Sequence, residues 1–182
     1  LLKKCINSIY KHTQGISFEI FVIDNASSDN SVALVRKNFP TVKLIINQEN
    51  KGFAAANNQG ASQTQGRYIL LLNPDTELKE DSLSKVARFM DKQPKCGIAG
   101  CHLENPDGAH QDSVRRFPSF WDQILILLKA HHIFPRLAIF RRYLYVDFDY
   151  SRQQKVEQVM GAFFMIRREM IEQIGLLDEK FF

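Results

Sequence analysis

Short apolar runs alternate with amphipathic stretches through the first hundred residues. The runs have the length and the β-branched content of buried strands, and the stretches between them carry apolar residues at helical spacing. Strands are predicted at 18–23, 42–46, 68–72 and 97–103. Helices are predicted at 1–11, from Asn30 to Pro40, at 52–63 and from Asp81 to Pro94. This order predicts an α/β fold with three α/β/α layers and a mostly parallel sheet.

The pattern changes after residue 104. Asn105–Gly108 predicts a turn within a hairpin, and residues 109–150 are irregular, basic and aromatic. A strand interrupted by Gly161 is predicted at 156–166, followed by a short helix at 168–174. We expect one domain, in two halves at 1–104 and 105–182, that is cut at both ends, since the chain opens in a helix and closes on an apolar pair.

Composition narrows the class of protein. With 182 residues and 45% apolar content, the chain can bury one full core. No run approaches the roughly 20 apolar residues that cross a membrane. Three cysteines, at 5, 96 and 101, are an odd number without metal-type pairing. They favour reduced, structural thiols in a cytoplasmic protein.

Positive charge is concentrated in one segment. The net charge is +4, and 115–142 holds six Lys or Arg residues against one acid, Asp122. Nucleic acid is not an expected partner, because the basic residues occupy this segment only. An apolar stripe at 120–128 precedes most of them, which favours either peripheral membrane contact through 119–142 or a helix packed on the domain. His131 and His132 have no nearby acidic partner, so metal binding is not expected there.

Two predicted strands end in carboxylates. Asp24 follows the first, and Asn73-Pro74-Asp75-Thr76-Glu77 follows the third. The carboxyl ends of parallel strands meet at one edge of a sheet, where ligands bind. Asp75 and Glu77 could hold one Mg²⁺ or Mn²⁺, which in turn could hold a diphosphate. The alternatives are a polar turn for the second motif and a helix cap for Asp24.

Two further motifs suit phosphate groups. In Asn50-Lys51-Gly52-Phe53-Ala54-Ala55-Ala56-Asn57-Asn58, small residues open a helix whose free N–H groups can face an anion. Close packing of that helix on the sheet explains the small residues equally well. Arg115 and Arg116 form a guanidinium pair that suits a phosphate, or else surface ion pairs.

Taken in order, these motifs resemble family 2 glycosyltransferases of the Rossmann-like A-type fold. The resemblance spans 1–182 and is weakest at about 119–150. It implies a nucleotide-diphosphate sugar donor, a divalent cation, and a donor half at 1–104 beside an acceptor half at 105–182. Donor binding is expected at Asp24, Asn25, Asn50, Gly52, Asn57, Asn73 and Asp75, metal binding at Asp75 and Glu77, and acceptor binding at Arg115, Arg116, Gly161 and Ala162.

The subgroup resembles rhamnosyltransferases of polysaccharide and O-antigen assembly. That resemblance implies inverting transfer from deoxythymidine-diphosphate-rhamnose to a saccharide or lipid-linked acceptor, in the cytoplasm or on the inner membrane face. Many members have Asp where Asn73 stands and Arg where Asn57 stands. The general base is expected beyond Phe182. A nucleotidyltransferase and a non-catalytic binding module are the alternatives.

Overall fold

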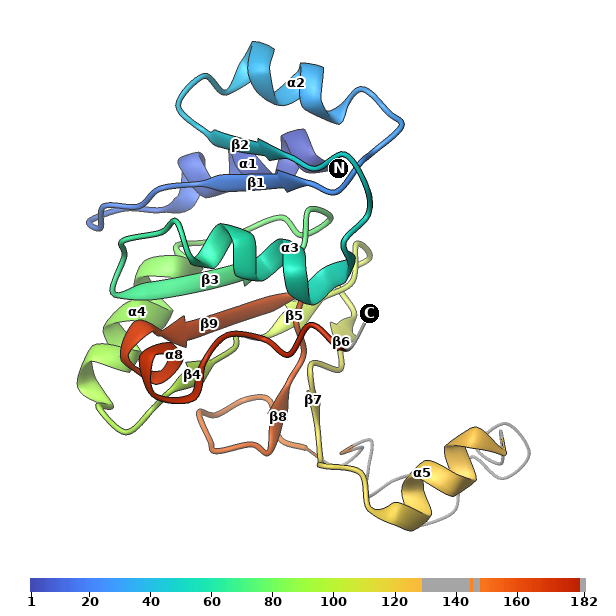
Figure 1. The fold of residues 1–182 in the computed structure, drawn as a ribbon. Coiled ribbons are helices and arrows are strands. Elements are labelled where there is room, and N and C mark those ends of the chain that lie inside the picture. Colours follow the sequence, from blue (N-terminus) through green and yellow to red (C-terminus); the bar gives the residue numbers. More distant parts are fainter. Residues whose placement is uncertain (129–144, 146–147, 181–182) are drawn as a thin grey trace. The chain divides into compact units, whose positions relative to one another are not determined.

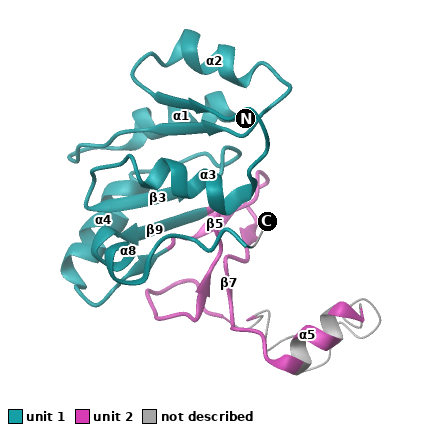
Figure 2. Ribbon diagram, in the orientation of Figure 1, with its two compact units in different colours: residues 1–99, 163–182 teal, residues 100–162 magenta. Residues whose placement is uncertain are grey.

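The computed structural model describes residues 1–128, 145 and 148–180, and it divides into two compact units (Figure 2). Unit 1 comprises residues 1–99 and 163–182, and unit 2 comprises residues 100–162. Unit 1 therefore contains both the strand–helix alternation and the last strand and helix of the chain. These units divide the chain differently from the expected halves at 1–104 and 105–182, whose separate roles stay a prediction.

Unit 1 holds the elements that the hydrophobic pattern predicts. Its helices are α1 (Leu2–His12), α2 (Ser31–Asn38), α3 (Gly52–Ala61), α4 (Ser82–Lys92) and α8 (Arg168–Ile174). Its strands are β1 (Phe21–Asp24), β2 (Lys43–Ile46), β3 (Tyr68–Leu72), β4 (Ile98–Ala99) and β9 (Phe163–Arg167). Asp81 caps α4 as expected, since its carboxylate accepts a hydrogen bond from the Ser84 backbone N–H.

The strand directions are mixed. β1 and β2 pair in parallel, whereas β9 lies between β3 and β4 and runs antiparallel to both. The α/β fold is confirmed, but the expectation of a mostly parallel sheet is not. The reason is that β9, at residues 163–167, inserts between β3 and β4, which come from the strand–helix alternation of the first hundred residues. This insertion brings an antiparallel strand into the sheet. Figure 1 shows β1, β2 and β3 pointing to the same side of unit 1.

Two apolar clusters hold unit 1 together. The first joins α1, α2, β1 and β2 around Ile6, Val35, Phe39 and Val42. The second joins α3 to β3 and β9 through Ala61, Ile69, Leu71 and Ile166. Helix α3 approaches β1 so closely that a Cβ at Gly60 would lie 2.7 Å from Cδ1 of Ile23. The small residues of α3 therefore serve the packing that we weighed as an alternative to ligand binding.

Unit 2 is built from short antiparallel pairs. β5 (Leu103–Glu104) pairs with β6 (His110–Gln111), and β7 (Val114–Arg115) pairs with β8 (Gln158–Val159). The hairpin turn at Asn105–Gly108 is confirmed by the hydrogen bond from the Gly108 N–H to the Asn105 carbonyl. The strand predicted at 156–166 divides at Gly161 into β8 and β9, which belong to different units.

The basic, aromatic segment contains more order than the irregular pattern predicted. Besides β6 and β7, it holds α5 (Phe120–Leu127), where the apolar stripe predicted a helix. The basic residues between Lys129 and Arg142 lie outside the described residues. Within the described part of the chain, no helix is long and apolar enough to span a membrane.

Candidate functional site

A hydrogen-bonded cluster of asparagines lies where β1 and β2 end and α3 begins. The Asn25 amide nitrogen donates to Oδ1 of Asn50 (2.7 Å) and to the Gly52 carbonyl (3.3 Å). Its Oδ1 accepts from Nδ2 of Asn47 and from the Lys51 backbone N–H, both at 3.1 Å. Three of the expected donor-binding residues, Asn25, Asn50 and Gly52, are thereby brought together.

The backbone on both sides of this cluster is in the left-handed region. Gly52 has a φ of 82° and opens α3, and Asn50 Oδ1 accepts its N–H at 3.0 Å. Ala26, next to Asn25, has a φ of 63°, which costs an alanine roughly 1 kcal/mol or more. Such strain persists where the surroundings hold the chain in place, as the asparagine cluster does here.

Asp24 closes β1 from a buried position, with only 6% of its surface exposed. Its carboxylate accepts the Ser27 backbone N–H at 3.2 Å, and its carbonyl accepts the Asn47 N–H. The alternative role as a helix cap does not apply, since the residue at the start of α2 is Asn30. Asp24 therefore shapes the turn after β1.

The loop after β3 carries Asp75 and Glu77 on its exposed side. The Asn73 carbonyl accepts both the backbone N–H and the hydroxyl of Thr76, which closes the loop. Burial raises the pKa of the Cys5 thiol beneath this loop, and the negative charges of Asp75 and Glu77 raise it further, against an opposing hydrogen bond with Thr76.

These two carboxylates suit a hard divalent cation. Mg²⁺ is commonly held by one or two carboxylates, while water and substrate phosphates supply its other ligands. Among the described residues there is no group of three or more His, Cys, Asp or Glu side chains placed to hold a metal by themselves. Metal binding by Asp75 and Glu77 stays a prediction, in which water and a diphosphate would supply the other ligands of the ion.

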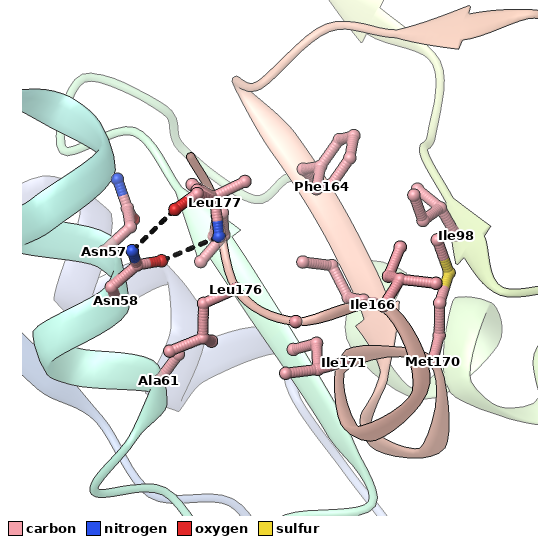
Figure 3. Close-up of a pocket in the computed structure, with 13 residues that line it drawn as sticks. Asn57, Asn58, Ala61, Ile98, Phe164, Ile166, Met170, Ile171, Leu176 and Leu177 are labelled. Atoms are coloured by element: carbon pink, nitrogen blue, oxygen red, sulfur yellow. Dashed lines mark hydrogen bonds between the residues drawn. The ribbon is translucent and has the colours of Figure 1, made fainter. Parts of the chain in front are cut away.

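Asn57 and Asn58 are neighbours on α3 with different surroundings. The half-buried Asn57 bonds within the helix, where its amide donates to the Phe53 carbonyl at 2.8 Å on the exposed side. Asn58 is buried and bonds to the segment after α8 (Figure 3). Both border an apolar cavity of about 130 Å³ formed by α3, β9, α8 and that segment. Asn57 keeps an accessible position for a ligand, whereas the Asn58 amide is occupied.

The expected acceptor residues all lie in unit 2. The Arg115 guanidinium donates to the Val114 carbonyl at 2.7 Å, and the Arg116 guanidinium lies 4.6 Å from the centre of the Tyr145 ring. Within the described residues, the buried Nε of Arg116 has no hydrogen-bond partner. Gly161 and Ala162 form the turn after β8. The expected donor residues all lie in unit 1, so each set stays within one unit.

The sequence pattern did not single out Asn47 as a residue of this site. It is buried, with 6% exposed, and it bonds to both Asp24 and Asn25. Its signal was present in the sequence, because it is a polar residue directly after a predicted strand, as Asp24 and Asn73 are.

The chain is similar to known proteins of one family. Residues 1–175 match the family model described as Glycosyl transferase family 2. An N-acetylglucosaminyl-diphospho-decaprenol L-rhamnosyltransferase of Mycobacterium tuberculosis is 24% identical over 178 residues, which cover 90% of this chain and 56% of that protein. The O-antigen biosynthesis protein RfbC of Myxococcus xanthus is 26% identical over 186 residues, which cover all of this chain and 14% of that protein. The chain thus spans little more than half the length of the first relative.

Solved structures agree on the fold. The mannosyltransferase PcManGT of Pyrobaculum calidifontis, in complex with GDP-Man and Mn²⁺, matches with a TM-score of 0.62 at 16% identity, over 98% of this chain and 44% of that one. S. aureus TarS 1-349 in complex with UDP also matches with a TM-score of 0.62 at 16% identity, over 98% of this chain and 46% of that one. With the motifs and the match over 1–175, the chain belongs to glycosyl transferase family 2.

Proposed function

We propose that this chain is the nucleotide-sugar-binding part of an inverting glycosyltransferase of cell-surface polysaccharide synthesis. The observation that carries the proposal is the asparagine cluster, which holds the ends of β1 and β2 against the first turn of α3. The first N–H groups of a helix and the positive end of its dipole favour phosphate. Family membership supports a nucleotide-sugar donor for this edge.

The proposed donor contacts are inferred from the positions of the side chains at this edge. The Asp24 carboxylate, at the end of β1, can accept hydroxyl or N–H groups of a nucleoside. Asn57 on α3 can bond the ribose or a phosphate by giving up its bond to Phe53. Asn25 and Asn50 act indirectly, because their amides already bond to one another and to the start of α3.

A Mg²⁺ or Mn²⁺ ion bound through Asp75 and Glu77 would neutralise charge on the donor diphosphate as it leaves. Both side chains are exposed, so they can take up a hydrated ion together with the donor. The solved relative PcManGT was obtained with Mn²⁺, which supports a divalent cation for this fold.

The reaction proposed for the whole protein is a single displacement. The acceptor hydroxyl oxygen bonds to the anomeric carbon from the face opposite the nucleotide. The bond from that carbon to the diphosphate oxygen breaks, and the diphosphate takes the electron pair. A carboxylate expected beyond Phe182 takes the hydroxyl proton as general base. The similarity to a rhamnosyltransferase supports rhamnose as the transferred sugar and a deoxythymidine diphosphate donor.

A lipid-linked acceptor is proposed from unit 2. The Arg116 guanidinium, 4.6 Å from the centre of the Tyr145 ring, carries a positive charge that suits an acceptor phosphate. Phe117, Phe120, Leu127 and Leu128 each expose most of their surface in and beside α5. Apolar side chains followed by the basic residues of 129–142 suit peripheral contact with an anionic membrane face.

The test is sugar transfer by the full-length protein. The purified protein would be supplied with a polyprenyl-diphosphate-linked saccharide and with dTDP-rhamnose, UDP-N-acetylglucosamine or GDP-mannose in turn. The proposal expects product from dTDP-rhamnose with an inverted anomeric configuration, read by NMR. Transfer from another donor would support a glycosyltransferase but refute rhamnose as the transferred sugar. No transfer from any donor, with no nucleotide binding, would favour a non-catalytic module.

A further inference from the structure

Asn58 makes an unusual set of long-range bonds from the middle of α3. Its Nδ2 donates to the Leu177 carbonyl and to Oε1 of Glu179, both at 2.8 Å. Its Oδ1 accepts the Leu177 backbone N–H at 2.9 Å (Figure 3). Both amide hydrogens and the amide oxygen are thus bonded to a segment about 120 residues further along the chain.

The segment that Asn58 holds has a loosely filled apolar side. Leu176 and Leu177 border the cavity of about 130 Å³, together with Phe164, Ile171 and Ile174. Side chains that line unfilled space lose dispersion contacts on that side. Gly175, with a φ of 88°, releases the chain from α8 immediately before it. We therefore attribute much of the order of 177–179 to the Asn58 bonds.

The chemistry of these bonds selects asparagine. An aspartate at this position would still accept the Leu177 N–H, but it would lose both donors. It would also place a carboxylate beside that of Glu179, and like charges at hydrogen-bond distance repel strongly. An alanine would lose all three bonds. Only a carboxamide supplies two donors and one acceptor from this position.

We propose that Asn58 is a positioning residue that holds Glu179 and its backbone segment beside Asn57 on α3. The inference rests on the proposed function, which gives Asn57 a donor contact. Segment 177–179 then lies next to the donor, with its carboxylate in a defined place. Loss of Asn58 should therefore reduce turnover more than it reduces donor binding.

A structural readout tests the positioning without any assay of activity. Amide hydrogen exchange at Leu177 would be compared in this chain for wild type, Asn58→Ala, Asn58→Asp and the double variant Asn58→Asp/Glu179→Gln. We expect exchange at Leu177 to rise roughly tenfold or more in Asn58→Ala and in Asn58→Asp. In Asn58→Ala the Leu177 N–H loses its acceptor, and in both variants the segment 177–179 loses order. The double variant should recover part of the protection, since the carboxamide introduced in place of Glu179 can donate to the carboxylate introduced in place of Asn58. Asn38→Ala, which removes one bond within α2, is the matched control and should leave Leu177 unchanged.

The functional readout uses the full-length protein. Asn58→Ala should lower kcat at least tenfold while the donor KM stays within about threefold. Unchanged protection of Leu177, or a loss spread evenly over all amides of unit 1, would overturn the proposal. If the Asn58 variants loosen locally at Leu177 but the wild-type full-length protein transfers no sugar, the proposed function is refuted and the positioning by Asn58 stands. Equal falls in kcat for Asn58→Ala and Asn38→Ala would also overturn it.

Discussion

Replacing Asn25 by alanine tests whether the asparagine cluster is a stable part of the fold. The change removes four hydrogen bonds, to Asn50, Gly52, Asn47 and Lys51. Two of them are partly buried and contribute about 1 kcal/mol each, and the two exposed ones contribute less. Asn47 is buried and would keep an amide donor without its partner, which adds to the cost. We expect a loss of about 2–3 kcal/mol in the free energy of unfolding.

The assay is urea denaturation followed by far-UV circular dichroism, with Asn38→Ala as the control. Asn38 is exposed, and among the described residues its side chain bonds to the Leu34 carbonyl within α2, so its replacement should change stability by no more than about 0.5 kcal/mol. Asn25→Asp should also destabilise, since a carboxylate would face the Asn50 Oδ1 and the Gly52 carbonyl. A loss for Asn25→Ala as small as that of the control would show that the asparagine cluster does not organise the loop.

Three further changes can be read with the same denaturation assay. Ala26→Gly should stabilise the chain by about 1 kcal/mol, because glycine adopts a φ of 63° without strain, and any destabilisation would contradict this. Asp81→Ala should cost about 1 kcal/mol at pH 7 through loss of the α4 cap. The hydrogen bonds from Ser84 lower the pKa of Asp81, so its contribution is present above the ordinary carboxyl pKa and disappears as pH falls through the lowered one. A gap between wild type and variant that does not narrow as pH falls would be inconsistent with it. Met90→Ala should cost about 2–5 kcal/mol, since Met90 has no exposed surface, and a cost below 1 kcal/mol would show that the core collapses around it.

The elements of unit 1 could be predicted because their periodicity is local. Tyr68–Leu72 and Arg168–Ile174 form the strand and the helix at the predicted residues, and Asp81 caps α4 as its sequence context indicated. The place of β9 could not be predicted in this way. Its pairing with Tyr68–Leu72 depends on contacts nearly a hundred residues apart, and no periodic signal records strand order or direction.

The sequence could indicate which edge of the sheet carries polar residues, and the binding roles of those residues stay predictions. Polar residues after β1 and β3 marked the edge, but the same reasoning could not assign hydrogen bonds within it. The Asn25 amide bonds to four neighbouring groups, and donor binding by Asn25 stays a prediction. Asn58 follows Asn57 in the same motif, but a rotation of one residue around the helix turns its amide toward Leu177. Such differences depend on tertiary packing and are invisible to spacing alone.

We propose above all that this edge of unit 1 binds a nucleotide diphosphate through a cation at Asp75. Calorimetric titration with deoxythymidine, uridine and guanosine diphosphates, with and without Mn²⁺, measures it directly. The matched variants are Asp75→Ala and Glu80→Ala, because Glu80 is an exposed acid near the same loop whose carboxylate pairs with Lys85. We predict Mn²⁺-dependent binding in wild type and Glu80→Ala, tightest for the thymidine nucleotide, and at least tenfold weaker binding in Asp75→Ala. Binding that ignores Mn²⁺, or that survives unchanged in Asp75→Ala, would contradict the claim.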